Sequence, residues 1–234
     1  MKKAANGFVI AATVKKQYFA AAVVLAESIR DFIPDANITL FTEDKFLDGM
    51  TNLPFDNVVT DCPITIRTKL YALWNSPYEK TCYLDADMEV IKEGVTGIFD
   101  LLDDDNDIAM TKVNPAVAAQ THIMHGTVPL IWHCGMFIYH TERMRSFMKE
   151  WDFQFHDQRE NPTKYPGEIK DMRWDQTTFA RLLATEYKDV KIKELDTNWN
   201  FIYTNYLDPN LDTAILYHYI LSGTGTGDET KWHI

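Results

Sequence analysis

The N-terminal part of the chain alternates between two apolar patterns, and this alternation constrains the fold more than any other feature of the sequence. Residues 7–14 (GFVIAATV) form a short continuous apolar run, which is typical of a strand buried on both faces. Residues 16–32 are rich in alanine and carry further apolar side chains at helical spacing. A turn is expected at 34–37 and a second strand at 38–42 (ITLFT). Strand, helix and strand in this order predict parallel pairing and an α/β fold.

The rest of the chain continues this alternation. Residues 65–80 predict a helix that ends near Pro77, and residues 81–91 (TCYLDADMEVI) predict a strand that is broken at its two aspartates. Five further elements are expected, namely strands at 108–113, 130–140 and 211–220 and helices at 141–155 and 174–187. Because no Ser/Gly-rich linker, repeat or low-complexity tract divides the chain, we expect residues 1–234 to form one α/β domain with a mostly parallel central sheet.

The charge of the chain narrows the choice of partners. Nucleic-acid-binding proteins normally carry basic clusters, whereas this chain has a net charge of −11 and no basic run longer than two residues. We therefore expect no nucleic-acid partner. A negative chain that binds a negatively charged substrate needs a metal ion or local cations at the site.

Two features of the sequence bear on where the protein resides. Lys15 and Lys16 split the N-terminal apolar stretch into halves too short to cross a bilayer, and no other stretch approaches about 18 apolar residues. We therefore expect no membrane span. Cys62, Cys82 and Cys134 are odd in number and show no CxxC spacing. They predict reduced thiols packed as small hydrophobic groups, and hence a reducing, cytoplasmic location.

Two aspartates, Asp85 and Asp87, interrupt an otherwise apolar strand. Residues two apart in a strand point to the same face, where two carboxylates repel each other and are costly to bury unpaired. A divalent cation relieves both problems, and hard oxygen ligands suit Mg²⁺ or Mn²⁺. Ligands of open α/β sheets collect at the carboxyl ends of strands, where this motif lies. The alternative is an aspartate pair that caps a turn or binds an arginine.

One histidine is a candidate third ligand. His218 lies in the apolar run 215–219, where a lone histidine is more often a satisfied core residue. Combined with a carboxylate pair, a neutral imidazole suits a borderline metal such as Mn²⁺, so we favour a ligand role for His218. The remaining histidines, including His133 and His140, are expected to be structural or exposed.

Two other polar segments have simpler explanations. The acidic cluster at 103–107 is expected to form a solvated turn before the strand at 108–113. The segment GTGTG at 223–227 lacks the following helix that a dinucleotide-binding fingerprint requires. We interpret residues 221–234 as a mobile tail that covers phosphates; a disordered tail is the alternative.

The segment TKLYALWNSPYEKTCYLDADMEVI (68–91) resembles the core of the GT-A glycosyltransferases, most closely glycosyltransferase family eight, the glycogenin-like group. Weaker blocks follow the family order over most of the chain, namely FVIAATVKKQYFAAAVVLAESI, HCGMFIY, WDQTTFARLL, TNWNFIY and LYHYILSG with a later KW. The resemblance implies a GT-A (Rossmann-like) domain that uses Mn²⁺ or Mg²⁺. It also implies transfer of a sugar from a nucleotide-diphosphate donor, a UDP-hexose, with retention of anomeric configuration.

The resemblance also implies roles for individual residues. It places Asp85, Asp87 and His218 on the metal, and Asp175 and Gln176 at the reacting centre. Asp is also a preferred helix cap, so Asp175 has a structural alternative that can coexist with this role. The resemblance also implies contacts with the donor. Ala12, Thr13 and Tyr18 would lie at the base and ribose, Asp85 at the ribose or the metal with Ala86 beside it, and Cys134 and Gly135 at the sugar. Lys69 would approach the sugar or a phosphate, and Lys231 would bind the diphosphate.

The sequence departs from the family pattern in three places. His133 stands where the family usually has asparagine. Gly223 and Lys231 lie further from His218 than in the family, and Trp232 lacks the usual preceding proline.

Two other function classes stay open. A nucleotidyltransferase also binds metal with paired aspartates, but it requires a Gly-rich basic loop after the first strand, and residues 12–18 contain no glycine. A non-catalytic module that binds a nucleotide sugar or a glycan can lose Asp87 or His218, and both are present. The acceptor, whether glycan, protein or lipid, is not identified; the loops 114–130 and 156–172 are candidates for its binding.

Overall fold

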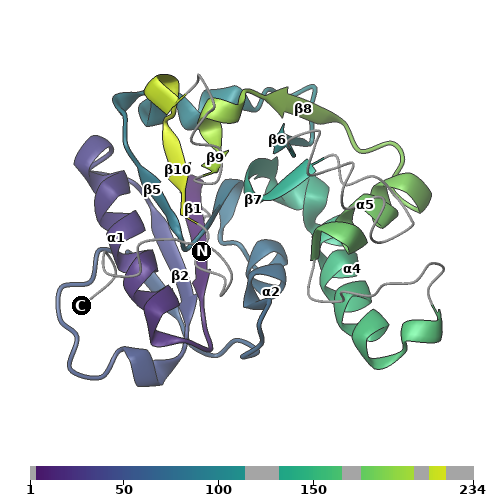
Figure 1. Cartoon of the computed structure of the whole chain (residues 1–234), viewed down its shortest axis with the longest axis horizontal. Coiled ribbons are helices and arrows are strands. Elements are labelled where there is room, and N and C mark those ends of the chain that lie inside the picture. The colour runs from purple at the N-terminus through teal and green to yellow at the C-terminus, as the bar shows by residue number, and fades with distance from the viewer. Residues whose placement is uncertain (1–3, 114–131, 165–174, 203–210, 220–234) are drawn as a thin grey trace.

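The computed structural model describes residues 4–113, 132–164, 175–202 and 211–219 (Figure 1). Within them, seven strands form one sheet in the order β3-β2-β1-β4-β7-β6-β8. Their bounds are Ala4–Ala12 (β1), Ile38–Thr42 (β2), Asn57–Val59 (β3), Tyr78–Asp85 (β4), Ile108–Lys112 (β6), Trp132–His140 (β7) and Ile192–Leu195 (β8). Pairing is parallel throughout except that β7 runs antiparallel to both β4 and β6. The predicted α/β fold with a mostly parallel sheet is therefore confirmed.

Four α-helices are described, namely Lys16–Phe32 (α1), Thr68–Trp74 (α2), Thr141–Glu160 (α4) and Asp175–Thr185 (α5). The α1 helix lies on one face of the sheet, and α2, α4 and α5 lie on the other (Figure 1). Strand β1 contributes to both cores, because Phe8 and Ile10 pack with α1 while Val9 packs with α2. The continuous apolar run at 7–14 therefore has the cause inferred for it, a strand buried on both faces.

Two helix predictions differ from the structure in length. The helix expected at 65–80 begins only at Thr68, because the Thr68 hydroxyl bonds the carbonyls of Pro63 and Thr65 and holds that segment as a turn. The helix expected at 141–155 continues to Glu160. Two polar side chains in its later turns, Gln154 and Gln158, are buried, and Arg181 of α5 donates hydrogen bonds to both.

A second sheet of three short strands has the order β5-β10-β9, with β5 at Met88–Val90, β10 at Leu216–His218 and β9 at Phe201–Ile202. The expected strand at 211–220 is therefore reduced to three residues within the described part. Residues Leu211–Thr213 form a 3-10 turn instead, in which the Thr213 hydroxyl donates to the side chain of Asn198. Among the described residues, further 3-10 segments are at Asp44–Phe46, Glu93–Leu101, Pro162–Lys164 and Thr197–Trp199.

Two simpler expectations, the turn at 103–107 and the buried thiols, are also met. The carboxylate of Asp103 accepts from the backbone of Asp105 and Asn106 and pairs with Lys193, so the acidic cluster is a turn. All three cysteines are free and buried. None of the described helices combines the length and apolar character needed to cross a membrane.

Candidate functional site

The site lies where β4 ends. Strand β4 stops at Asp85, a two-residue turn holds Ala86 and Asp87, and β5 begins at Met88. Asp87 is thus presented by the turn, and the predicted break of the strand at its two aspartates is confirmed. Because β5 pairs with β10, His218 lies opposite Met88, next to both carboxylates.

The three predicted metal ligands are brought together. Nε2 of His218 lies 3.1 Å from Oδ1 of Asp87 and 3.9 Å from Oδ2 of Asp85. One ligand atom from each of the three residues lies within 4.8 Å of the others. Two carboxylate oxygens and one imidazole nitrogen form a donor set that suits Mn²⁺.

A glycine leaves the space beside these ligands. Gly135 lies in β7, and a Cβ atom added there would stand 2.7 Å from Cε1 of His218, 2.8 Å from Cε1 of His133 and 3.0 Å from Oδ2 of Asp85. The two ring contacts are shorter than real Cβ atoms show, and the contact with Asp85 is tighter than almost all of them. The absence of a side chain at 135 is therefore a condition for the observed arrangement.

A layer of amide and imidazole groups backs the ligands. The buried side chain of Asn200 lies between two rings, with Oδ1 at 3.1 Å from Nδ1 of His218 and Nδ2 at 2.7 Å from Nδ1 of His133. Burial, together with the charges of His218 and Lys69, lowers the pKa of His133 to about 3, so this ring is neutral at neutral pH. His133 was expected to be structural or exposed, and the structure places it against His218.

A cation joins this cluster to Asp175. Nζ of Lys69 lies 3.3 Å from Oδ1 of Asp85 and 2.8 Å from Oδ2 of Asp175, and it donates to the carbonyl of Cys134. The contact with Asp175 is an ion pair, since Oδ2 accepts no hydrogen bond of good angle. On the other side of Asp175, Nε of Arg67 donates to Oδ1 at 3.1 Å. Sequence analysis missed Arg67, which lies just before α2.

The charges of this cluster stabilise one another. Burial lowers the pKa of Lys69, but the carboxylates of Asp175 and Asp85 outweigh burial and raise it above its ordinary value. Burial raises the pKa of Asp175, but Lys69 and Arg67 outweigh that and hold the pKa below its ordinary value. Asp175 is therefore an ionised carboxylate at neutral pH, although only 4% of its surface is exposed.

The other residue expected at the reacting centre lies beside Asp175. Gln176 is in the first turn of α5, and its Nε2 donates to the carbonyl of Trp132 in β7. The backbone carbonyl of Asp175 accepts from Nε1 of Trp151. Asp175 begins α5, and Trp174 before it lies outside the described residues. The capping role expected of Asp175 therefore stays a prediction.

The end of β1 forms another wall. Ala12 and Thr13 are buried, and the Thr13 hydroxyl lies 3.0 Å from the Thr65 carbonyl and 3.0 Å from the Thr68 hydroxyl. Val14 follows with φ of 73°, an uncommon conformation for a β-branched residue, and its N–H donates to Oε1 of Glu43 at 2.6 Å. Sequence analysis did not single out Glu43.

Two more expected donor contacts come near the aspartates. Burial and the charges of Asp87 and Asp85 raise the pKa of the Tyr18 hydroxyl above its ordinary value. Ala86 is buried between them. Lys231, residues 221–234 with GTGTG, the loop 114–130 and residues 165–172 of the expected loop 156–172 lie outside the described residues.

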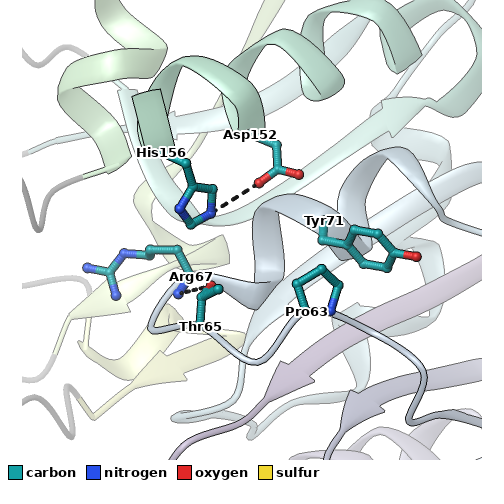
Figure 2. Close-up of a pocket in the computed structure, with 6 residues that line it drawn as sticks. All are labelled: Pro63, Thr65, Arg67, Tyr71, Asp152 and His156. Carbon is teal, nitrogen blue, oxygen red and sulfur yellow. Dashed lines mark hydrogen bonds and ion pairs between the residues drawn. The ribbon is translucent and has the colours of Figure 1, made fainter. Parts of the chain in front are cut away.

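A cavity of about 230 Å³ lies between α2 and α4, and Figure 2 shows the residues that line it. Its lining residues are Pro63, Thr65, Arg67, Tyr71, Asp152 and His156. Asp152 and His156 form a pair in this wall, with Nε2 of His156 at 3.4 Å from Oδ1 of Asp152 (Figure 2). Arg67 is the lining residue that also contacts Asp175.

Comparison with known proteins identifies the fold. No family model matches the sequence, and no curated protein matches it by sequence. Among solved structures, the glycosyltransferase GlyE of Streptococcus pneumoniae superposes with a TM-score of 0.62 at 14% identity, over 97% of this chain and 60% of GlyE. The chain thus spans about three-fifths of the length of GlyE.

Two further structures match over nearly their whole length. The galactosyltransferase LgtC, solved with donor and acceptor sugar analogs, gives a TM-score of 0.58 at 17% identity, over 97% of this chain and 93% of LgtC. Mouse xyloside xylosyltransferase 1 gives 0.51 at 12% identity, over 91% of this chain and 97% of that chain. The chain therefore has the GT-A fold of these glycosyltransferases, as the resemblance of residues 68–91 predicted.

Proposed function

We propose that this chain is a metal-dependent glycosyltransferase of the family-eight type, which transfers a hexose from a UDP-linked donor with retention of configuration. The observation that carries this proposal is the meeting of Asp85, Asp87 and His218 at the carboxyl end of β4. In open α/β sheets this edge is where nucleotides bind. The shared fold with GlyE and LgtC, both glycosyltransferases, supports the same reaction class.

The residues present fit a divalent cation. The donor atoms are two carboxylate oxygens and one imidazole nitrogen within a span of 4.8 Å, and Gly135 keeps the space beside them open. This set favours Mn²⁺, with Mg²⁺ as the alternative. A bound cation of this kind supplies positive charge to the oxygens of a leaving diphosphate.

Lys69 and Arg67 supply the remaining positive charge of the site. The chain carries a net charge of −11, so a diphosphate needs local cations to enter. The Lys69 ammonium lies between Asp85 and Asp175, and we assign it to the sugar or the phosphate of the donor. We assign Lys231 to the diphosphate as well, on the family resemblance.

Asp175 holds a negative charge at the reacting centre. Retaining transfer builds positive charge on the sugar ring, and a fixed, ionised carboxylate stabilises such charge. Lys69 and Arg67 keep Asp175 ionised in a buried position. Gln176, anchored to the Trp132 carbonyl, lies next to it and is assigned to the sugar or acceptor.

The nucleoside end of the donor is assigned to the end of β1. Ala12, Thr13 and Tyr18 line this edge, with Ala86 on the β4 side, and Cys134 and Gly135 of β7 face the sugar. The strained Val14 and its bond to Glu43 fix this loop before any ligand arrives. The buried, free thiols suit a reducing compartment, and we place the protein in the cytoplasm.

Calorimetric titration with UDP tests the proposal. Binding is expected with Mn²⁺ and is expected to disappear in EDTA; Mg²⁺ should support weaker binding. Asp87→Asn keeps the size of the side chain but removes its charge, and it should abolish the effect of the metal. Equal UDP affinity with and without EDTA contradicts the metal-dependent site. A screen of UDP-sugars for Mn²⁺-dependent donor hydrolysis then identifies the hexose.

A further inference from the structure

A continuous line of hydrogen bonds runs from the backbone of β7 to the candidate metal site. The N–H of Gly135 donates to Nδ1 of His133 at 3.1 Å. The same nitrogen lies 2.7 Å from Nδ2 of Asn200, and Oδ1 of Asn200 lies 3.1 Å from Nδ1 of His218. The far nitrogen of His218, Nε2, then faces Asp87 at 3.1 Å.

The direction of each bond in this line follows from the first one. A backbone N–H can only donate, so Nδ1 of His133 must accept and carries no proton. The Asn200 atom that faces it must therefore be the NH₂ group, because two acceptors cannot share a hydrogen bond. The carbonyl oxygen of Asn200 then faces His218, and Nδ1 of His218 must be the nitrogen that donates to it. The orientation of the Asn200 amide and the role of Nδ1 in both imidazole rings thus follow from the one backbone N–H donor.

The bond from Asn200 to Nδ1 also determines the protonation of Nε2, the other nitrogen of the His218 ring. A neutral imidazole carries one proton, and Asn200 holds that proton on Nδ1. While Nε2 is protonated it donates to the Asp87 carboxylate at 3.1 Å. When the ring loses one proton and Asn200 keeps the other on Nδ1, the lone pair is on Nε2, on the side of Asp87 and Asp85 where a cation would lie. The other tautomer would turn an N–H toward Asp87 and would make a hydrogen bond there in place of a metal ligand.

We infer that Asn200 and His133 are positioning residues, which hold His218 in the Nδ1–H tautomer so that Nε2 is free to bind a divalent cation. The inference rests on the metal site of the proposed function. Histidines that bind metals commonly donate their other N–H to an oxygen, and loss of that partner typically weakens binding by about 10- to 100-fold. Here the partner is a side-chain amide, whose orientation is set in turn by His133 and the Gly135 backbone.

His133 is the unusual member of the line. It stands where the resembling family usually has asparagine, and Oδ1 of an asparagine can occupy the position of its Nδ1 as an acceptor. The aromatic contact adds rigidity, since the two rings meet edge to face with centroids 5.4 Å apart. His133 thus both orients Asn200 and packs against the ring that Asn200 orients.

Four variants separate this role from simple packing. Asn200→Ala removes the acceptor for His218 and should raise the Kd for Mn²⁺ by about 10- to 100-fold. His133→Phe keeps a ring but lets the amide of Asn200 turn over, and it should weaken binding by about tenfold. His133→Asn restores an acceptor and should stay within about threefold of the parent protein. Thr111→Val is the matched control: it removes the hydroxyl that accepts from Nδ2 of Asn200 at 3.4 Å but leaves the contacts of Asn200 with His133 and His218, so Mn²⁺ affinity should stay close to that of the parent protein.

Mn²⁺ affinity is measured by calorimetry without nucleotide, with thermal melting as the check on folding. A second measurement needs no variant and no metal: ring ¹⁵N spectra of histidine-labelled protein, taken over pH until each ring is neutral. They should show the remaining proton on Nδ1 in His218 and on Nε2 in His133. A neutral His218 that is protonated on Nε2 overturns the inference, as does a folded Asn200→Ala protein with unchanged Mn²⁺ affinity.

The two measurements also separate this inference from the proposed function. If the parent protein binds no Mn²⁺, the metal site of the proposed function fails, and with it the purpose of the tautomer. The ring spectra then still decide whether the hydrogen-bond line itself exists. If the parent binds Mn²⁺ and His133→Phe binds equally well, only the positioning role is wrong.

Discussion

Nζ of Lys69 lies 2.8 Å from Oδ2 of Asp175, which brings a residue of α2 into contact with the first residue of α5. The same ammonium lies 3.3 Å from Asp85 at the end of β4. One cation therefore connects the carboxylate assigned to the metal with the carboxylate assigned to the sugar. Without it, two negative groups would face each other across a largely buried space, at a cost in free energy.

Replacing Lys69 should therefore affect both ends of the site. Lys69→Met removes the charge and keeps much of the apolar stem. Hydrogen bonds to charged groups contribute about 1.5–3 kcal/mol, so UDP affinity in Mn²⁺ should fall by roughly 10- to 100-fold. Calorimetric titration of UDP measures this effect. Lys69→Arg keeps the charge and should lose less; equal losses for the two variants would show that shape, and not charge, matters at this position.

Asp175→Asn tests the chemical role of that carboxylate. The amide keeps the size of the side chain and much of its capping ability, but it loses the charge. Donor binding should survive, because Asp175 is not assigned to the metal or the nucleotide. Transfer or donor hydrolysis should fall by at least about 100-fold, the scale of an electrostatic contact in the transition state. Steady-state kinetics with the UDP-sugar found by the donor screen check this, and unchanged turnover would leave Asp175 as a structural residue.

The same carboxylate predicts a pH dependence of stability. Lys69 and Arg67 hold the pKa of folded Asp175 below its ordinary value, so the folded chain binds this proton less readily than the unfolded chain. Its stabilising contribution is therefore complete above the unfolded pKa, near about 4, and is lost as the pH falls through the folded pKa. Urea unfolding of the parent protein and Asp175→Asn should differ by a constant free energy between about pH 5 and 7. The difference should shrink below about pH 4, and growth in acid would contradict the assignment.

The sequence predicts the candidate metal ligands better than the residues that contact and orient them. The aspartates and His218 are conspicuous because polar groups at the ends of apolar strands need an explanation, and α1 was predicted at its observed bounds because Ala-rich amphipathic spacing is a local signal. Arg67 and Asn200 carry no such signal. Their roles depend on which turns pack against Asp175 and His218, and that is decided by contacts between distant segments.

The same reason explains the errors in element length. Strand β10 is short because Thr213 bonds Asn198, and α4 is long because Arg181 buries its glutamines. Both effects need a partner far away in the sequence. By contrast, the break between β4 and β5 was predicted, because Asp85 and Asp87 interrupt the apolar run locally and no distant partner is needed to detect this.

A single methyl group at position 135 should weaken metal binding, because there is no space for it between the candidate ligands. Gly135→Ala would place Cβ 2.7 Å from the His218 ring, 2.8 Å from the His133 ring and 3.0 Å from Oδ2 of Asp85. The rings are held by Asn200 and the backbone of β7, so His218 and Asp85 must move apart, and the donor atoms then no longer surround one cation. We expect Mn²⁺ affinity to fall by at least about tenfold.

Gly97→Ala is the matched control for this prediction, because a Cβ atom there meets nothing within 4 Å. It should leave Mn²⁺ affinity and melting temperature close to those of the parent protein. Gly135→Ala should also lower the melting temperature, since overpacking a buried position typically costs about 1–3 kcal/mol. Mn²⁺ titration at a temperature well below both melting transitions separates lost ligand geometry from lost folding. A folded Gly135→Ala protein that binds Mn²⁺ as tightly as Gly97→Ala would mean that the cation, if bound, does not lie between Asp85 and His218.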